Sequence, residues 1–210
     1  TAGEYVIRGK YWFDNVNLPW SKNIKQLIKA PYGVAVNCFY LFSHSSLLTY
    51  ANLTNMIISN ADAMFNMYRA SDNGGPLLSE IVIKNTRLLK DASLKSFCNN
   101  NKAIIEIDVG GLVLEGGHNC SFMFGGCPNL QTITGLEKLD MSKVTNLENM
   151  FKSCSSLTTL DVSRWNTSNI TSTLSMFSGC TNLQNIIGLE NWDVSKVENM
   201  SSMFKNCINF

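Results

Sequence analysis

The sequence predicts an α/β repeat solenoid with one parallel sheet, short helices on the opposite side and an N-terminal β cap. Three observations lead to this prediction. A motif containing Met-Phe and Cys returns at a nearly fixed interval, apolar residues within it recur at helical spacing, and a strand-like alternation follows each cysteine. Each repeat unit is therefore expected to contain a strand, a turn and a short helix.

The helical element is predicted from the motif that begins at Met150 and recurs, at a nearly constant interval, at Met123, Met176 and Met203. In one copy the apolar positions are Leu147, Met150, Phe151 and Cys154. This i, i+3, i+4, i+7 spacing places them on one face of two helical turns. The Met-Phe pairs are accordingly interpreted as core, and so are Trp165 and Trp192, because they share a position with Leu139.

The strands are predicted where the spacing becomes alternating, as in Leu160 and Val162. By register they lie near residues 48–51, 80–84, 104–108, 131–134, 158–162 and 184–187. Residues 36–210 form the solenoid, degenerate at first and then, over 105–210, built of regular repeats of about 26 residues. The most N-terminal copies are carried by Phe97 with Cys98, by Met64 with Phe65, and by His44 in the cysteine position. Residues 1–35 do not fit the repeat and are expected to form a β-rich cap.

The charge balance and the hydropathy of the chain argue against nucleic acid and membrane insertion, respectively. Seventeen basic and 16 acidic residues leave a formal charge of +1, so no basic surface for nucleic acid is expected. No segment approaches the roughly 20 apolar residues of a membrane helix, so membrane insertion is not expected. A surface made mainly of Asn, Ser and Thr suits an extracellular or particle-borne protein.

The seven cysteines allow three interpretations: metal ligands, disulfides between neighbouring coils, or a row of buried free thiols. Structural zinc sites usually pair cysteines two to four residues apart, whereas Cys127, Cys154, Cys180 and Cys207 lie a whole repeat apart. A buried row is favoured because cysteine is often buried even when unpaired. No metal and no cofactor are predicted.

Catalysis is not expected. The chain has two histidines, His44 and His118, and residues as close in sequence as His118 and Cys120 do not arrange a nucleophile facing its base. No sequence motif of a hydrolase, a metalloprotease, a P-loop or a dinucleotide site occurs.

The segment from Asn191 to Cys207, Asn-Trp-Asp-Val-Ser-Lys-Val-Glu-Asn-Met-Ser-Ser-Met-Phe-Lys-Asn-Cys, resembles the BspA-like leucine-rich-repeat family. The resemblance is close over residues 131–210 and looser over about 45–130. It implies a leucine-rich-repeat array and a place among bacterial surface proteins and adhesins, with related arrays in phage and protozoan surface proteins. Thr173 departs from the family pattern because it is polar where other copies are apolar. The opening block, with Gly3-x-Tyr5 and Tyr11-x-Phe13-Asp14-Asn15, is similar to the start of some phage tail and fibre modules.

From these observations we expect a non-catalytic recognition or adhesion module, which is displayed on a bacterial surface or a phage particle and binds a host protein or glycan. Its expected binding surface is the solvent face of the parallel sheet, where rigid repeated backbone sets the side chains. The candidate residues are Glu80, Glu106, Asp108, Thr132, Thr134, Thr159, Asp161 and Asn185. The alternative is a structural virion component whose array packs against neighbouring subunits.

The sequence also predicts that the last coil is covered. Phe210 occupies the leucine position just before a next strand, and an uncapped solenoid exposes apolar core and an unpaired edge. We therefore expect the native chain to continue or another subunit to cover this end.

Overall fold

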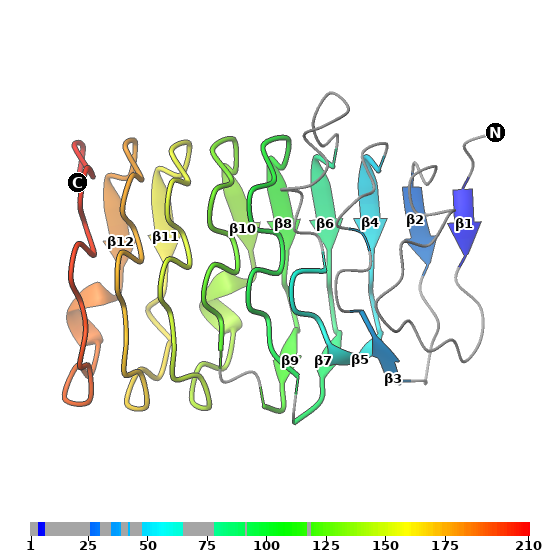
Figure 1. Cartoon of the computed structure of the whole chain (residues 1–210), viewed down its shortest axis with the longest axis horizontal. Helices are drawn as coiled ribbons and strands as arrows, with labels where there is room; N and C mark the ends of the chain where they lie inside the picture. Colours follow the sequence, from blue (N-terminus) through cyan, green and yellow to red (C-terminus); the bar gives the residue numbers. More distant parts are fainter. Residues whose placement is uncertain are drawn as a thin grey trace.

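The computed structural model is a β-solenoid in which successive coils of the chain stack side by side along one axis (Figure 1). The structure describes residues 4–6, 26–29, 35–38, 42, 48–64, 78–90, 92–116 and 119–210. His44, Phe65, His118 and most of the expected N-terminal cap lie outside the described residues. None of the described helices is long and apolar enough to span a membrane.

The first sheet contains six parallel strands in the order β1-β2-β4-β6-β8-β10. A separate parallel pair, β11-β12, follows it. The bounds are β1 (Glu4–Val6), β2 (Gln26–Lys29), β4 (Tyr50–Asn52), β6 (Glu80–Val82), β8 (Glu106–Asp108), β10 (Thr132–Thr134), β11 (Thr159–Asp161) and β12 (Asn185–Ile187). The six predicted strand positions and their parallel direction are confirmed. The prediction of a single sheet is wrong, because strand pairing stops between β10 and β11.

The coils nevertheless remain stacked across that break. On the opposite side of the core, parallel bridges join Asn119, Asn146, Ser172 and Asn199 in succession. Ser156 N also donates to the Pro128 carbonyl of the coil before it, at 3.1 Å. The solenoid is therefore continuous where the first sheet is not.

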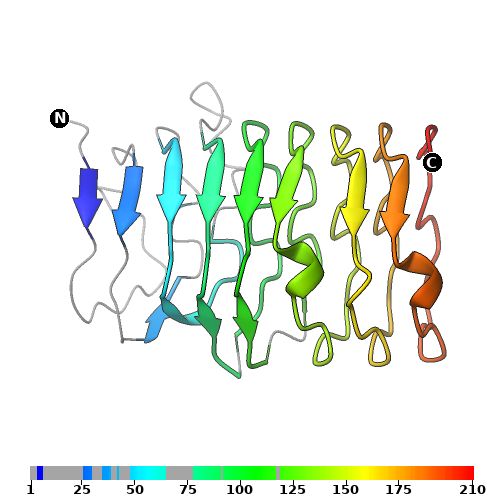
Figure 2. The same ribbon diagram turned by 180° about the vertical axis from the view of Figure 1, so that it is seen from behind.

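A second parallel sheet, which the sequence did not reveal, has the order β3-β5-β7-β9. Its strands are β3 (Ala35–Asn37), β5 (Ile57–Asn60), β7 (Arg87–Leu88) and β9 (Val113–Leu114). In Figure 2, two short 3₁₀ helices take the place below β10 and β12 that β7 and β9 take below β6 and β8. These helices are η3 (Leu136–Lys138) and η4 (Leu189–Asn191).

The two 3₁₀ helices explain the uneven repeat length. The longer step runs from Thr132 to Thr159 and again from Ser172 to Asn199, and each of these segments contains a 3₁₀ helix. The step from Thr159 to Asn185 is shorter by a single residue and contains none. Each helix follows a glycine with positive φ, Gly135 at 81° or Gly188 at 89°. The longer repeat therefore accommodates a left-handed glycine and one tight turn.

The predicted short helices are not confirmed: the Met-Phe-Cys segments are runs of consecutive turns. We call this side of the solenoid, residues 94–100, 120–127, 147–154, 173–180 and 200–207, the turn wall. Met150, Lys152 and Cys154 each donate to the carbonyl three residues earlier, whereas an α-helix bonds four residues back. Intervening N–H groups bond to the next coil, as Phe151 N does to Met176 O at 2.9 Å.

The turn run is possible because left-handed residues recur four positions apart. The pairs with positive φ are Ser96 and Asn100, Phe122 and Gly126, Asn149 and Ser153, Ser175 and Gly179, and Ser202 and Asn206. Most are Asn, Ser or Gly; Asn and Gly are the usual occupants of this conformation. The resulting fold buries the same residues that a helix face would have buried.

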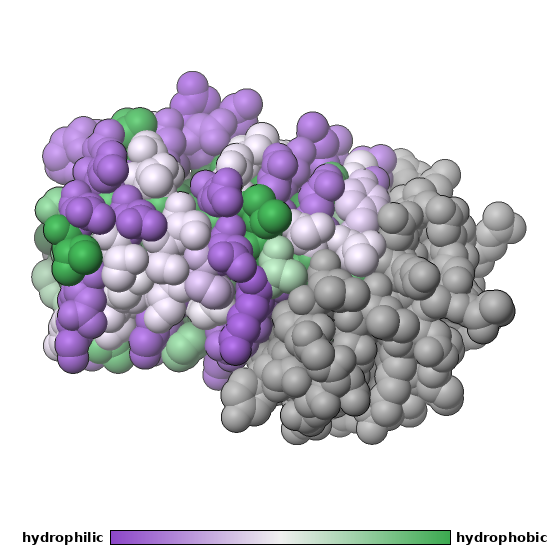
Figure 3. Space-filling model, turned by 90° about the horizontal axis from the view of Figure 1, so that it is seen from above, coloured by the Kyte–Doolittle hydropathy of each residue, from purple (hydrophilic) through white to green (hydrophobic). Residues whose placement is uncertain are grey.

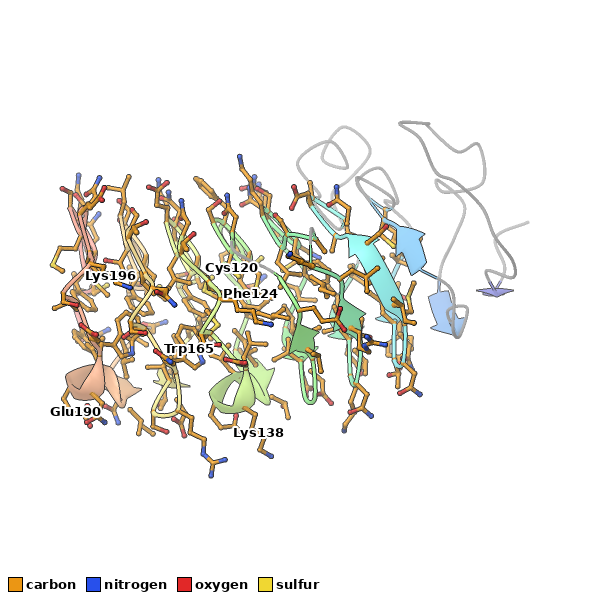
Figure 4. The ribbon with its side chains drawn as sticks, turned by 90° about the horizontal axis from the view of Figure 1, so that it is seen from below. Cys120, Phe124, Lys138, Trp165, Glu190 and Lys196 are labelled. Carbon is orange, nitrogen blue, oxygen red and sulfur yellow. The ribbon has the colours of Figure 1, made fainter. Side chains whose placement is uncertain are left out.

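The core is a stack of like residues. The rings of Phe124, Phe151, Phe177 and Phe204 stack with centroid distances of 5.5, 5.6 and 5.5 Å between neighbours. Trp165 stacks on Trp192 at 6.0 Å and donates from Nε1 to the Leu136 carbonyl at 2.9 Å. Figure 4 shows Phe124 and Trp165 among the side chains enclosed by the coils. Their interpretation as core is confirmed.

The range expected to form the cap contributes strands to the array itself. β1 pairs with β2 in parallel, and β2 pairs with β4, so both extend the first sheet. The division into a cap over 1–35 and a solenoid over 36–210 remains a prediction.

Candidate functional site: the sheet face

The outward side of β4, β6, β8, β10, β11 and β12 is a mostly polar surface, here called the sheet face. In each of these three-residue strands the central side chain points inward, because successive side chains in a strand alternate between faces. Ile81, Ile107 and Leu160 are such buried centres. The two flanking residues of each strand are therefore presented to solvent in parallel rows.

The candidate residues are aligned in register within each sheet. Glu80 pairs with Glu106 and Glu106 with Thr132, while Asp108 pairs with Thr134. Beyond the break, in the separate pair β11-β12, Thr159 pairs with Asn185, and Asp161 pairs with Ile187. Glu106, Thr132, Thr134, Thr159 and Asn185 are exposed, and Glu80, Asp108 and Asp161 are half-buried. The structure thus places all eight predicted residues on one side of the solenoid, in two groups divided where strand pairing stops.

Two of the acidic side chains also shape the backbone. Asp108 Oδ1 accepts from Gly110 N at 2.8 Å, and its Oδ2 lies 3.5 Å from Lys84 Nζ. Asp161 Oδ1 accepts from both the Oγ and the N of Ser163, at 2.6 and 3.0 Å. The hydrogen bonds from Ser163, side chain first and backbone second, lower the pKa of Asp161 below its usual value. Asp161 therefore remains ionised at neutral pH, and both aspartates fix the turn after their strand.

Glu80 and Glu106 lie directly opposite each other on neighbouring strands. Neighbouring strands are about 5 Å apart, and like charges placed opposite each other oppose pairing. Among the described residues, neither glutamate takes part in an ion pair. This end of the sheet face therefore concentrates negative charge that a cation or a basic group would neutralise.

Sequence analysis missed two members of the rows. Tyr50 pairs with Glu80 and Asn52 with Val82, so β4 extends the sheet face by one coil. Asn52 Nδ2 donates to the Tyr50 hydroxyl at 3.2 Å. A large aromatic side chain, Tyr50, therefore stands at the N-terminal end of this face. The predicted strand near 48–51 includes Tyr50, but its register with Glu80 was missed because the step between the two residues is longer than the regular repeat.

The cysteines lie on the other side of the core. Cys127, Cys154 and Cys180 are fully buried, which confirms the predicted row, and Cys207 is half-buried. Each thiol donates to a carbonyl of the preceding coil, as Cys154 Sγ does to Phe124 O at 3.1 Å. Burial raises the pKa of Cys180 to about 12 and that of Cys154 well above the usual range. Cys154 and Cys180 are therefore protonated at neutral pH, and the row of cysteines packs the core.

The chemistry offered by the described residues is that of polar recognition. In that part of the chain, no group of three or more His, Cys, Asp or Glu side chains is arranged to hold a metal ion. Seen from above, the coloured part of the surface shows mostly hydrophilic and weakly polar residues, with a few hydrophobic patches among them (Figure 3). Hydroxyl, amide and carboxylate groups on rigid strands supply both donors and acceptors for a polar partner.

Comparison with known proteins gives one family. Residues 118–210, which include the most regular coils, match the family described as "Mycoplasma protein of unknown function, DUF285". No curated protein and no solved structure matches the chain. The C-terminal coils are therefore similar to a family whose description states no function.

Proposed function

We propose that this chain is a non-catalytic recognition or adhesion module, displayed on a bacterial surface, that binds a host protein or glycan through the sheet face. The observation that carries the proposal is the register of the sheet face, where side chains that are polar except at Val82 and Ile187 stand in rows on parallel strands. Rigid strands fix these groups at intervals of about 5 Å, so little side-chain and backbone freedom is lost when a partner binds.

Two similarities to other proteins support a bacterial setting. The regular coils are similar to a family described from Mycoplasma. The same coils resemble the BspA-like leucine-rich repeats, which belong to bacterial surface proteins and adhesins. We infer that the solenoid is of this leucine-rich-repeat type and that it acts by presenting a surface.

The test replaces exposed groups on the sheet face without disturbing the turns. The variant carries Glu106→Ala, Asp108→Asn, Thr159→Ala and Asp161→Asn, because asparagine keeps the acceptor oxygen that caps each turn. The control carries Ser201→Ala and Lys205→Ala, which are exposed on the turn wall. Both are applied, with the parent chain, to arrays of immobilised extracellular proteins and glycans.

Loss of array binding by the sheet-face variant alone, with an unchanged melting temperature, is the expected result. Equal binding by both variants, or no binding by the parent chain, would remove the sheet face as a recognition surface.

A further inference from the structure

Phe122 occupies a backbone conformation that an aromatic residue rarely adopts. Its φ is +54°, in the left-handed region. The equivalent residues of the other coils, also left-handed, are Ser96, Asn149, Ser175 and Ser202. A side chain at Cβ crowds the backbone in this region, and small polar residues tolerate it better than bulky ones. Only this coil of the turn wall places a large ring at the position.

The coil also makes room for that ring. A Cβ atom added to Gly125 would lie 3.2 Å from Phe122 Cδ1 and 2.9 Å from the Asn149 carbonyl oxygen. The ring edge therefore lies where a side chain at position 125 would stand. The equivalent positions in the other coils all carry side chains, Asn99, Lys152, Ser178 and Lys205. Phe122 and Gly125 together build a half-buried aromatic surface over bare backbone.

Polar groups frame this surface. Ser96 and Asn149 occupy the same position as Phe122 in the coils before and after it, about 5 Å away on each side. Asn99 Oδ1 lies 3.4 Å from the Cβ position at Gly125, and Lys152 is exposed in the next coil. The next apolar side chain on the outside of the turn wall is Leu174, two coils away. The frame therefore offers hydroxyl, amide and ammonium groups around a single ring.

We propose that Phe122, framed by Ser96, Asn99 and Lys152, is a binding site for one saccharide ring. A pyranose has an apolar face of C–H groups that packs on an aromatic ring, and a rim of hydroxyls that exchanges hydrogen bonds with amides and hydroxyls. A protein partner would instead need a cluster of apolar anchors, which this part of the turn wall lacks. The site is on the opposite side of the solenoid from the sheet face, so it does not depend on recognition there.

The test uses an array of immobilised neutral, N-acetylated and acidic saccharides, followed by titration calorimetry with each soluble saccharide that binds. The parent chain is compared with Phe122→Tyr, Phe122→Leu and Phe122→Asn. The matched control is Leu174→Ser, which removes a half-buried apolar side chain from the same wall. The sheet-face variant of the preceding section is included to separate the two surfaces.

Phe122→Tyr, Leu174→Ser and the sheet-face variant are expected to keep the affinity within about twofold. Phe122→Leu and Phe122→Asn are expected to lose at least about tenfold, which is about 1.4 kcal/mol of binding free energy. Phe122→Asn should not lower the melting temperature, because asparagine suits the left-handed backbone. The proposal is overturned if no saccharide binds the parent chain, if Phe122→Leu binds as the parent does, or if only the sheet-face variant loses affinity.

Discussion

The sheet face and the turn wall enclose the same core by different means. Strands β8 and β11 each bury one central side chain, Ile107 and Leu160, and present the two flanking side chains to solvent. The middle coils of the turn wall each bury several residues of nearly fixed identity, as Met150, Phe151 and Cys154 do. Fixed identity is thus concentrated on the turn wall, where identical rings stack, and the sheet face is left free to vary.

Both walls satisfy their backbone through the neighbouring coil. On the sheet this is the parallel ladder, and on the turn wall alternate N–H groups, such as Asn149 N to Leu174 O at 2.8 Å, perform the same task. Buried backbone groups must be paired in either case. The difference between the walls is therefore one of side-chain packing, and substitutions that remove packing are the means to test it.

The largest effect is expected for Phe151→Ala on the turn wall. The ring is fully buried and stacks between Phe124 and Phe177, so its removal leaves a cavity flanked by two rings. We expect a loss of about 3–5 kcal/mol in the free energy of unfolding, measured by denaturant titration. Leu160→Ala, at the centre of β11, is expected to lose about 2–3 kcal/mol.

The control is Lys152→Ala, which follows Phe151 but is exposed and should change stability by less than about 0.5 kcal/mol. A loss for Leu160→Ala equal to or larger than that for Phe151→Ala would contradict the turn wall as the better-packed side.

Gly188→Ala is expected to have the next largest effect. Gly188 has a φ of +89°, and a Cβ atom there would overlap the backbone of Ser163 in the preceding coil. Overpacking of this kind costs about 1–3 kcal/mol, which thermal and denaturant unfolding would measure. The matched substitution is Ser163→Ala, since the shorter coil carries no glycine there; it should lose far less. Equal stability of Gly188→Ala and the parent chain would show that the 3₁₀ coil does not require its glycine.

Thr173→Val is expected to stabilise the turn wall slightly. Thr173 is buried in the position that holds Leu147 in the preceding coil, and its hydroxyl has no hydrogen-bond partner among the described residues. Valine has nearly the same shape and lacks the unpaired hydroxyl, so we expect a gain of about 1 kcal/mol in the free energy of unfolding. Thr167→Val provides the contrast, because the Thr167 hydroxyl donates to the Asp193 carbonyl at 3.2 Å. A loss of stability in Thr173→Val would mean that its hydroxyl is satisfied in solution.

Sequence reasoning found the coils and the strands because the repeat fixes both at once. It failed on the turn wall, since an i, i+3, i+4, i+7 pattern of buried residues also arises from consecutive four-residue turns. In the structure, left-handed residues four positions apart, such as Ser175 and Gly179, distinguish these turns from a helix. The second sheet was missed because β7 and β9 are only two residues long. For the sheet face, alternation alone was sufficient to place Glu106 and Asp108. The unusual position of Phe122 could be recognised only from its backbone angles.

The smallest effect concerns the corner where the chain turns back toward the turn wall. Asp140 and Asp193 each accept from the serine two residues later, and those hydrogen bonds, from the serine side chain and then its backbone, lower both pKa values below 3.8. A carboxyl with a lowered pKa in the folded chain adds stability above its ordinary pKa and loses it as the pH falls through the lowered value. The double variant Asp140→Asn/Asp193→Asn should therefore lose less stability than the parent chain does as the pH falls below about 4, the ordinary pKa of an aspartate. Asn166 holds the same position in the coil between them and accepts from Ser168 N at 3.1 Å, which indicates that asparagine preserves the turn.

At neutral pH the variant should be only slightly less stable than the parent, because both carboxylates are largely exposed and their charge is screened by solvent. Unfolding curves over the acid range measure the difference, and parallel pH profiles for the two proteins would show that these carboxylates do not stabilise the corner.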